Sequence, residues 1–189
     1  MDLHGLVQLL RGALPVMLTG AGYTLLLAVA SVIFGALLGT LVAITRMARV
    51  PLLSQAATLY VSSMRGTPLL VQLFVIYFGL PSIGIQFGAI TSGILGLSLN
   101  VGAYLSETIR GAINGVEHGQ WNAARSLGLT QAQTLRYIVG PQALRLAVPS
   151  LSNSLISLIK DTSLVSVISV SELMLSTKTV IATTFQPFP

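Results

Sequence analysis

Charged side chains within apolar stretches are the residues of this sequence best suited to chemistry, and Glu107 is the clearest of them. It lies in the apolar stretch from about 89 to 113, where a dry, unpaired carboxylate would be costly. Glu107 would therefore bind a substrate ammonium group or a cation of another helix, or it would pair with Arg110, three residues further along, in a purely structural role. The sequence weighs these interpretations equally.

A second charged cluster, KDTS at residues 160–163, lies in another apolar stretch. Asp, Thr and Ser before an apolar run are typical N-cap residues, so we expect a helix to restart at Asp161, Thr162 or Ser163 within the membrane. The N-terminus of a broken helix presents free N–H groups to an anion such as a substrate carboxylate. The alternative is a local pair of Lys160 with Asp161 that only stabilises the bundle; we favour the binding role.

Glu107 belongs to a face of small and polar residues. These residues recur at steps of three and four: Gly93, Gly96, Asn100, Tyr104, Glu107 and Gly111. Such a face packs against protein or lines a cavity. In the preceding apolar stretch, Arg65 and Gln72 are seven residues apart and would share a helix face. They would line a translocation path, or Arg65 would reach the interface while Gln72 bonds to a neighbouring helix.

The composition places these residues in a bilayer. Hydrophobic residues make up 53% of the chain, charged residues 8%, and the mean hydropathy is +0.83, which excludes an ordinary water-facing surface. Ten basic against five acidic residues give +5, which indicates membrane topology and anionic lipid rather than nucleic acid. The chain has no cysteine and two histidines, so we expect no metal site.

Hydropathy predicts an all-α, polytopic membrane protein with about four spans in a single domain, 1–189. The expected spans cover about 16–44, 52–80 and 89–113, and a fourth begins near 144. A short interfacial helix would precede the first span. The Gly35 and Gly39 spacing favours ordinary packing within the chain, and Pro68 predicts a kink.

Basic residues set the expected orientation. Six of the ten fall on one side of the predicted spans: Arg46, Arg49, Arg110, Arg125, Arg136 and Arg145. An excess of basic residues marks the cytoplasmic side, so the N-terminus is expected outside.

The polar segment 114–143 is predicted to fold as two short helices on the cytoplasmic side. The first would cover 117–127 and end at Gly128; the second would start at a Thr130 to Gln133 capping box and stop before Pro141. Trp121 would then be an exposed aromatic anchor. The small residues around it would let this helix fit into a groove of a partner protein. The alternative is a loop that folds back on its own bundle.

Catalytic motifs are missing from the sequence. It has no G-x-x-x-x-G-K-[ST] phosphate loop, no H-E-x-x-H, no G-x-S-x-G and no cysteine nucleophile. We therefore expect no enzyme activity, no catalytic residue and no cofactor in this chain.

Several motifs resemble one known family. GQWNAARSLGL followed by PQALRLAVPSLSN resembles the cytoplasmic signature loop of permease subunits of bacterial ABC importers. RGTPLLVQLFVIYFGLP, AYLSETIRGAI and SLIKDTSLVSVISVSEL resemble the polar amino acid branch, with its histidine, glutamine, arginine and cystine permeases. These matches cover about residues 65–173.

The resemblance implies a multi-pass subunit of a bacterial inner membrane importer. Its partners would be membrane lipid, a second permease subunit in a homo- or heterodimer, an ABC ATP-binding subunit that uses the ATP, and an external solute-binding protein. The ATPase contact would comprise Trp121, Asn122, Ala123, Ala124 and Gly128. The substrate path would draw on Gln72, Asn100, Tyr104, Glu107, Asp161, Thr162 and Ser163.

Two departures from the family pattern are visible. Asn122 stands where the family usually has the Glu of its E-A-A signature, so we expect docking to survive with weaker coupling, because a charge-assisted contact is lost. The family usually continues into a fifth helix, and this chain ends at Pro189, as a fragment or without that span. The alternative function is a non-transporting scaffold or sensor that recruits an ATPase. Cystine is the faintly preferred cargo.

Overall fold

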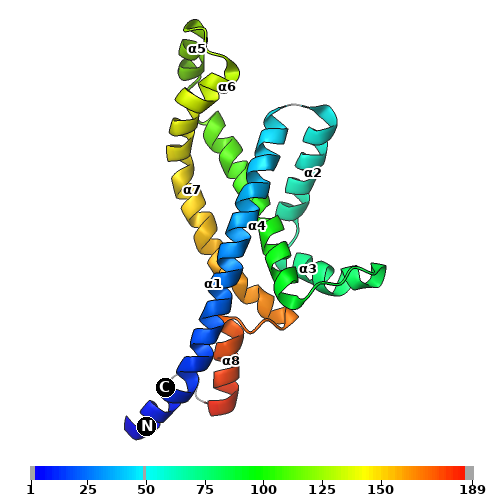
Figure 1. Ribbon diagram of the computed structural model, residues 1–189, viewed down its shortest axis with the longest axis vertical. Helices are drawn as coiled ribbons and strands as arrows, with labels where there is room; N and C mark the ends of the chain where they lie inside the picture. The colour runs from blue at the N-terminus through cyan, green and yellow to red at the C-terminus, as the bar shows by residue number, and fades with distance from the viewer. Residues whose placement is uncertain (1–2, 49, 186–189) are drawn as a thin grey trace. The chain divides into compact units, whose positions relative to one another are not determined.

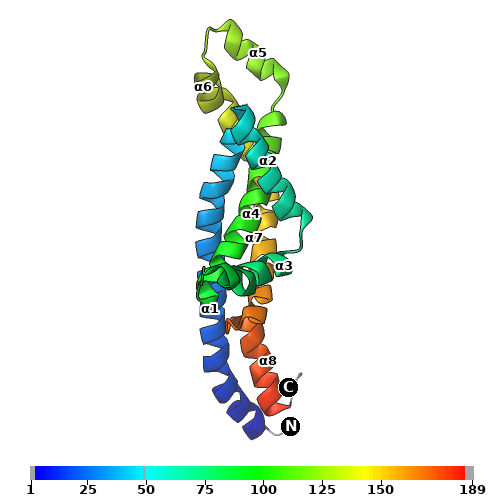
Figure 2. The same ribbon diagram turned by 90° about the vertical axis from the view of Figure 1, so that its right-hand side faces the viewer.

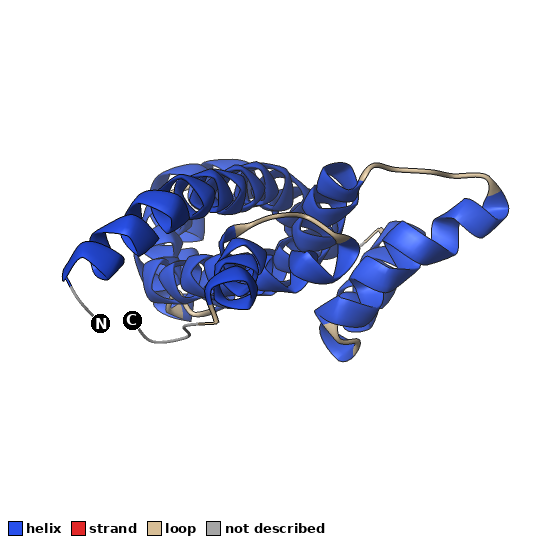
Figure 3. Ribbon diagram, turned by 90° about the horizontal axis from the view of Figure 1, so that it is seen from below, coloured by secondary structure: helices blue, strands red, loops and turns tan. Residues whose placement is uncertain are grey.

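The computed structural model describes residues 3–48 and 50–185, and at residues 3–10 only the backbone. Within these ranges the chain is helical and contains no strand (Figures 1 and 3), so the all-α prediction is confirmed. In chain order the elements are α1 (Leu3–Met47), α2 (Pro51–Gly66), α3 (Leu69–Phe74), the π-helix η1 (Val75–Gly79), the 3-10 helix η2 (Leu80–Ile83), α4 (Ala89–Asn114), α5 (His118–Ser126), α6 (Gln131–Thr134), the π-helix η3 (Leu135–Val139), α7 (Gly140–Asp161), the 3-10 helix η4 (Thr162–Ile168) and α8 (Leu173–Thr184).

Two helices are each long and apolar enough to cross a membrane, namely residues 11–47 of α1 and all of α4. Two pairs of helices pass the same test only together, across a short break: α2 with 69–83, and 131–168 with α8. With each pair taken as one span, the described residues provide up to four, as hydropathy predicted. The separate interfacial helix expected before the first span is wrong, because α1 begins at Leu3 and runs on through Pro15; the side chains of that segment lie outside the described residues.

The chain forms two compact units, one assembled from three separated stretches and the other from two. Unit 1 comprises Met1–Ser31, Pro68–Ser98 and Ser157–Pro189, and unit 2 comprises Val32–Thr67 and Leu99–Ile156. Because α1, α4 and α7 each supply residues to both units, the division does not follow the sequence. The single domain expected over the whole chain stays a prediction.

Unit 2 is held by a close approach of two backbones. A Cβ on Gly39 of α1 would lie 2.7 Å from the carbonyl oxygen of Gly102 in α4, and a Cβ on Gly102 would lie 3.2 Å from the carbonyl oxygen of Gly35. The G-x-x-x-G spacing therefore serves packing within the chain, as predicted. Val42, Val61 and Ala103 form a buried cluster of this unit.

Unit 1 is also held together by close helix packing at glycines. A Cβ on Gly93 would lie 2.7 Å from Cγ1 of Val165, and one on Gly96 would lie 2.7 Å from Cδ2 of Leu73, so the small-residue face of α4 packs against protein as expected. At the start of the chain, α8 lies beside α1 (Figures 1 and 2), where a Cβ on Gly20 would meet the Cβ of Ser176 at 2.8 Å.

The predicted kink near Pro68 is a full interruption of the helix. Thr67 (φ −116°, ψ 145°) and Pro68 (φ −62°, ψ 136°) are both extended, so α2 ends at Gly66 and α3 begins at Leu69. The expectation that Arg65 and Gln72 share a helix face is therefore wrong. Two extended residues reset the helical register between them.

Candidate functional site

The polar segment 114–143 forms the predicted helices and turn. After α5, Gly128 adopts φ +74°, the left-handed conformation that ends many helices. The N–H of Thr130 donates to Oε1 of Gln133 at 2.9 Å, and the N–H of Gln133 donates to Oγ1 of Thr130 at 3.3 Å. This reciprocal capping box was predicted from the sequence and is confirmed.

The second helix does not stop before Pro141, contrary to prediction. A π-helical turn, η3, joins α6 to α7, and the N–H of Gly140 donates to the carbonyl of Leu135. A proline ring normally meets the carbonyl of the preceding turn, and the wider π-turn relieves that clash. The side-chain amide of Gln142 also donates to the carbonyl of Ile138 at 3.0 Å, so the helix continues.

Trp121 is not the exposed anchor that the sequence suggested. It is partly buried and packs against a cluster of buried residues: Ala112, Val116, Val139, Ala143 and Ala147. Ala124 points to the interior as well, with 2% of its surface exposed. The apolar side of a short helix is stabilised by turning inward, so the alternative of a loop that folds back on its own bundle holds for these two residues.

The outward surface of the loop is formed by other residues. Asn122, Ala123 and Gly128 are exposed, and Leu127 is 78% exposed. We call these four residues the outer face of α5. Leu127 caps the helix and is followed by left-handed Gly128, which turns the chain away. Its hydrophobicity at the tip of a polar loop was the signal that sequence reasoning passed over.

Glu107 contacts two guanidinium groups within unit 2. Nη1 of Arg46, on α1, donates to Oε1, and Nη2 of Arg110 donates to Oε2 at 2.7 Å. The side chains of Arg46 and Glu107 are 14% and 20% exposed. Both predicted kinds of partner are therefore present, a cation of another helix and the local Arg110. The cluster carries one excess positive charge.

Other polar residues of α4 also contact α2. Nδ2 of Asn100 donates to the carbonyl of Met64 at 3.3 Å, and Oη of Tyr60 donates to the carbonyl of Leu99 at 2.6 Å. Tyr104 is 43% exposed, and Cζ of Arg65 lies 5.3 Å from the centre of its ring, a cation–π distance. Asn100, Tyr104 and Glu107 thus each join α4 to a neighbouring helix.

The predicted helix restart at Asp161 is wrong. Asp161 has helical dihedral angles (φ −67°, ψ −20°), makes no cap hydrogen bond, and leads directly from α7 into η4. Oγ1 of Thr162 donates to the carbonyl of Ile159, and Oγ of Ser163 donates to that of Lys160, both at 2.7 Å. These hydroxyls bond backward to carbonyls as the turn tightens, so they do not cap a new N-terminus.

The true restart lies at Glu172, which sequence reasoning missed as a site. Ser169 takes a left-handed conformation (φ 66°), and the buried Glu172 carboxylate then accepts from the N–H groups of Met174 (2.7 Å) and Leu175 (2.9 Å). Oγ1 of Thr24 accepts from the N–H of Leu173 at 3.1 Å. The signal was the acidic residue of SEL directly before an apolar segment, because a carboxylate at a helix N-terminus interacts favourably with the helix dipole.

The predicted substrate-path residues therefore fall into two groups. Asn100, Tyr104 and Glu107 lie in unit 2. Unit 1 holds Gln72, which is 7% exposed on α3, together with 161–163. Helix α3 packs against η4, so Gln72 and the Thr162 to Ser163 pair lie on contacting elements. Their role in a substrate path stays a prediction.

These features define a multi-pass helical membrane protein whose long polar segment folds as a helical loop. Residues 35–187 match the family described as "Binding-protein-dependent transport system inner membrane component", and the chain belongs to this family. It is thus a transport permease of the inner membrane, and the predicted resemblance is confirmed. Membership of a transport family agrees with the expectation of a subunit that is not an enzyme.

Curated relatives and a solved structure agree with this assignment. The chain is 49% identical to the "Probable amino-acid ABC transporter permease protein YckA" of Bacillus subtilis, over 85% of this chain and 71% of that one. It is 46% identical to the "L-cystine transport system permease protein TcyB" of the same organism, over 84% and 68%. A chain from the "Crystal structure of an amino acid ABC transporter with histidines" superposes with a TM-score of 0.90 at 36% identity, over 100% of this chain and 86% of that one. The scaffold alternative is not favoured, because these relatives are named as transporters or their permeases.

Proposed function

We propose that this chain is the membrane-spanning subunit of an ATP-driven amino acid importer, and that the outer face of α5 is its contact with a separate ATP-binding subunit. The observation that carries the contact is the division of α5 into two sides. Trp121 and Ala124 hold the helix to its own unit, while Leu127, at 78% exposure, leaves an apolar side chain for a partner. An exposed apolar side chain leaves water when a partner covers it, and this burial stabilises the complex.

The assembly we propose follows from this assignment. A second permease subunit completes the membrane part, and an external solute-binding protein delivers the amino acid. Arg125 and Arg136 both lie in the loop, residues 114–143. Basic residues favour the cytoplasmic side of a membrane protein. We therefore propose that the loop is cytoplasmic and the N-terminus outside.

The contact is tested with Leu127→Ala in the assembled complex. We expect the variant to keep its folded permease but to lose retention of the ATP-binding subunit on affinity purification and ATP-dependent uptake in proteoliposomes. Leu52→Ala is the matched control, because Leu52 is equally exposed at 78% and lies outside the loop. Equal retention of the ATP-binding subunit by both variants would show that Leu127 is not part of the contact.

The unusual Asn122 provides a second test. Asn122→Glu restores a carboxylate on the exposed side of α5, and we expect stronger coupling of ATP hydrolysis to uptake, because charge-assisted hydrogen bonds are the stronger ones. Unchanged assembly and unchanged uptake would contradict the weaker coupling assigned to Asn122.

The cargo is tested by uptake with labelled amino acids. L-cystine is the first to assay, since one relative at 46% identity is named for it. Uptake that requires ATP and the binding protein would support the proposal, and ATP-independent accumulation would contradict it.

A further inference from the structure

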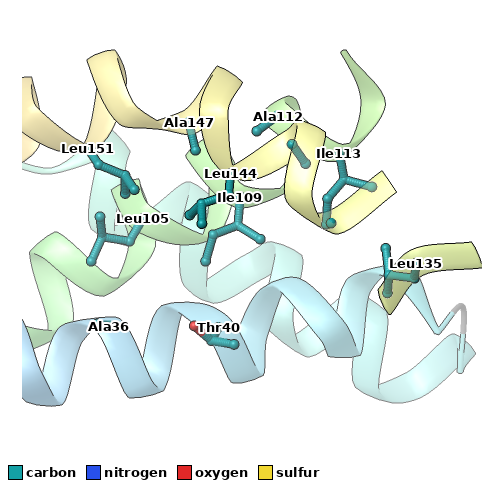
Figure 4. A pocket seen from close by; sticks show the side chains of 12 residues that line it. Ala36, Thr40, Leu105, Ile109, Ala112, Ile113, Leu135, Leu144, Ala147 and Leu151 are labelled. Carbon is teal, nitrogen blue, oxygen red and sulfur yellow. The ribbon is translucent and has the colours of Figure 1, made fainter. Parts of the chain in front are cut away.

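An apolar cavity lies inside unit 2, between α1, α4 and α7. Its volume is about 370 Å³, and Figure 4 shows Ala36 and Thr40 of α1 facing leucine, isoleucine and alanine side chains of the other two helices. Among the described residues that line it, Thr40 alone carries a polar side chain. Leu144, also on its wall, is 62% exposed, so the cavity opens at the surface of its unit.

Water is a poor occupant of this cavity. The volume would take roughly a dozen water molecules, yet each would need two to four polar partners that the apolar walls do not offer. An empty cavity would forfeit the dispersion contacts of its lining. An apolar chain satisfies both requirements, and the bilayer around this family of membrane proteins supplies one.

Two arginines directly follow residues that line the cavity. Leu135 and Leu144 both line it, although they are nine residues apart. Arg136 and Arg145 each follow one of these leucines, so they lie displaced in the same direction around the helix. Both are exposed.

These arginines have no acidic neighbours along the chain. From His118 to Lys160 the sequence contains no Asp or Glu, and the ion pairs of the described residues all involve Glu107. Exposed arginines at a membrane surface attract anionic lipid headgroups, and arginine suits phosphate through its planar, multiple donors.

We propose that this cavity binds one acyl chain of an anionic phospholipid, with the phosphate held by Arg136 and Arg145. The apolar walls account for the chain, and the two unneutralised guanidinium groups account for the charge of the headgroup. Zwitterionic lipids satisfy the walls but gain less from the arginines.

The test is lipid retention by the purified full chain. The protein is incubated with equal amounts of phosphatidylglycerol and phosphatidylcholine in mild detergent, and bound lipid is counted by native mass spectrometry. We expect phosphatidylglycerol to be preferred, and the double variant Arg136→Gln, Arg145→Gln to lose the preference, at about fivefold per arginine.

Two variants fill the cavity from different helices, Thr40→Phe and Leu144→Trp, and both should lower retention of both lipids severalfold. Leu37→Phe is the control, because Leu37 lies on α1, is 66% exposed and does not line the cavity. Retention by both filling variants equal to that of Leu37→Phe would overturn the proposal. Equal binding of the two lipids by the unmodified protein would also overturn it. The proposal would likewise fail if the filling variants abolished a dimer of the chain while lipid retention stayed constant.

Discussion

The side-chain amide of Asn100 on α4 donates to the backbone carbonyl of Met64 on α2 at 3.3 Å. Within an uninterrupted helix this carbonyl would accept from residue 68, four positions later, but Pro68 has no N–H. Asn100 therefore supplies a donor at the point where the chain leaves α2. A residue proposed for the substrate path is thus also part of the connection between two helices.

We expect Asn100→Leu to lower the free energy of unfolding by about 1–3 kcal/mol, because a partly buried carbonyl loses this donor. Thermal unfolding of the purified chain in detergent measures the change. Asn153→Leu is the control, since Asn153 is exposed on α7. An equal loss in both variants would show that the Met64 contact contributes little.

The pairing of Arg46 with Glu107 predicts strong coupling between the two residues. Glu107→Gln and Arg46→Gln should each destabilise the chain, and the double variant should be more stable than the sum of the two losses predicts, by about 0.5–3 kcal/mol. A double-mutant cycle on unfolding measures this coupling energy. Glu117→Gln combined with Arg46→Gln is the control, because Glu117 is exposed and belongs to no recorded ion pair of the described residues. Additive losses at Glu107 and Arg46 would refute the pairing.

Gly140 is required by the π-turn. A Cβ at this position would lie 2.6 Å from the carbonyl oxygen of Leu135, and backbone there has little freedom to move. We expect Gly140→Ala to lower the melting temperature of the chain. Gly119→Ala should leave it unchanged or raise it, because nothing lies within 4 Å of a Cβ on Gly119 and alanine favours a helix by about 1 kcal/mol over glycine. The idea fails if both variants melt alike.

Glu172 and Glu117 form a matched pair, because both occupy N-cap positions but only Glu172 accepts hydrogen bonds from its helix. Glu172→Ala should cost about 1–3 kcal/mol, since two N–H groups lose their acceptor. Amide hydrogen exchange at Met174 and Leu175 should become faster. Glu117→Ala should change neither quantity at α8, and unchanged exchange in Glu172→Ala would contradict the cap.

Features that depend on neighbouring residues were predictable. The Thr130 to Gln133 capping box and the left-handed Gly128 follow from residue types a few positions apart, and the structure contains both. The α4 boundaries follow from the length of an apolar run. The inward orientation of Trp121 and the outward orientation of Leu127 were not predictable. Trp121 turns inward only because residues of α4 and α7 form a buried cluster against which it packs.

The position of the helix break shows the same limit. KDTS and SEL are both plausible helix starts, and the choice between them depends on Thr24, which accepts from Leu173 across 149 positions. Likewise, Pro141 predicts a helix end, and a π-turn together with Gln142 bypasses it.

By itself, the sequence determined the class of the protein, the approximate spans, the capped loop and, through its motifs, the transport family. Hydropathy, helix capping and left-handed glycines depend on residues that are close together in the sequence, so the sequence alone is enough to predict them. Tertiary structure alone decided that Glu107 meets Arg46, 61 residues away, that Leu127 and not Trp121 faces outward, and that Glu172 starts the last helix. These outcomes depend on which distant surfaces and charges meet, and a linear pattern does not specify that.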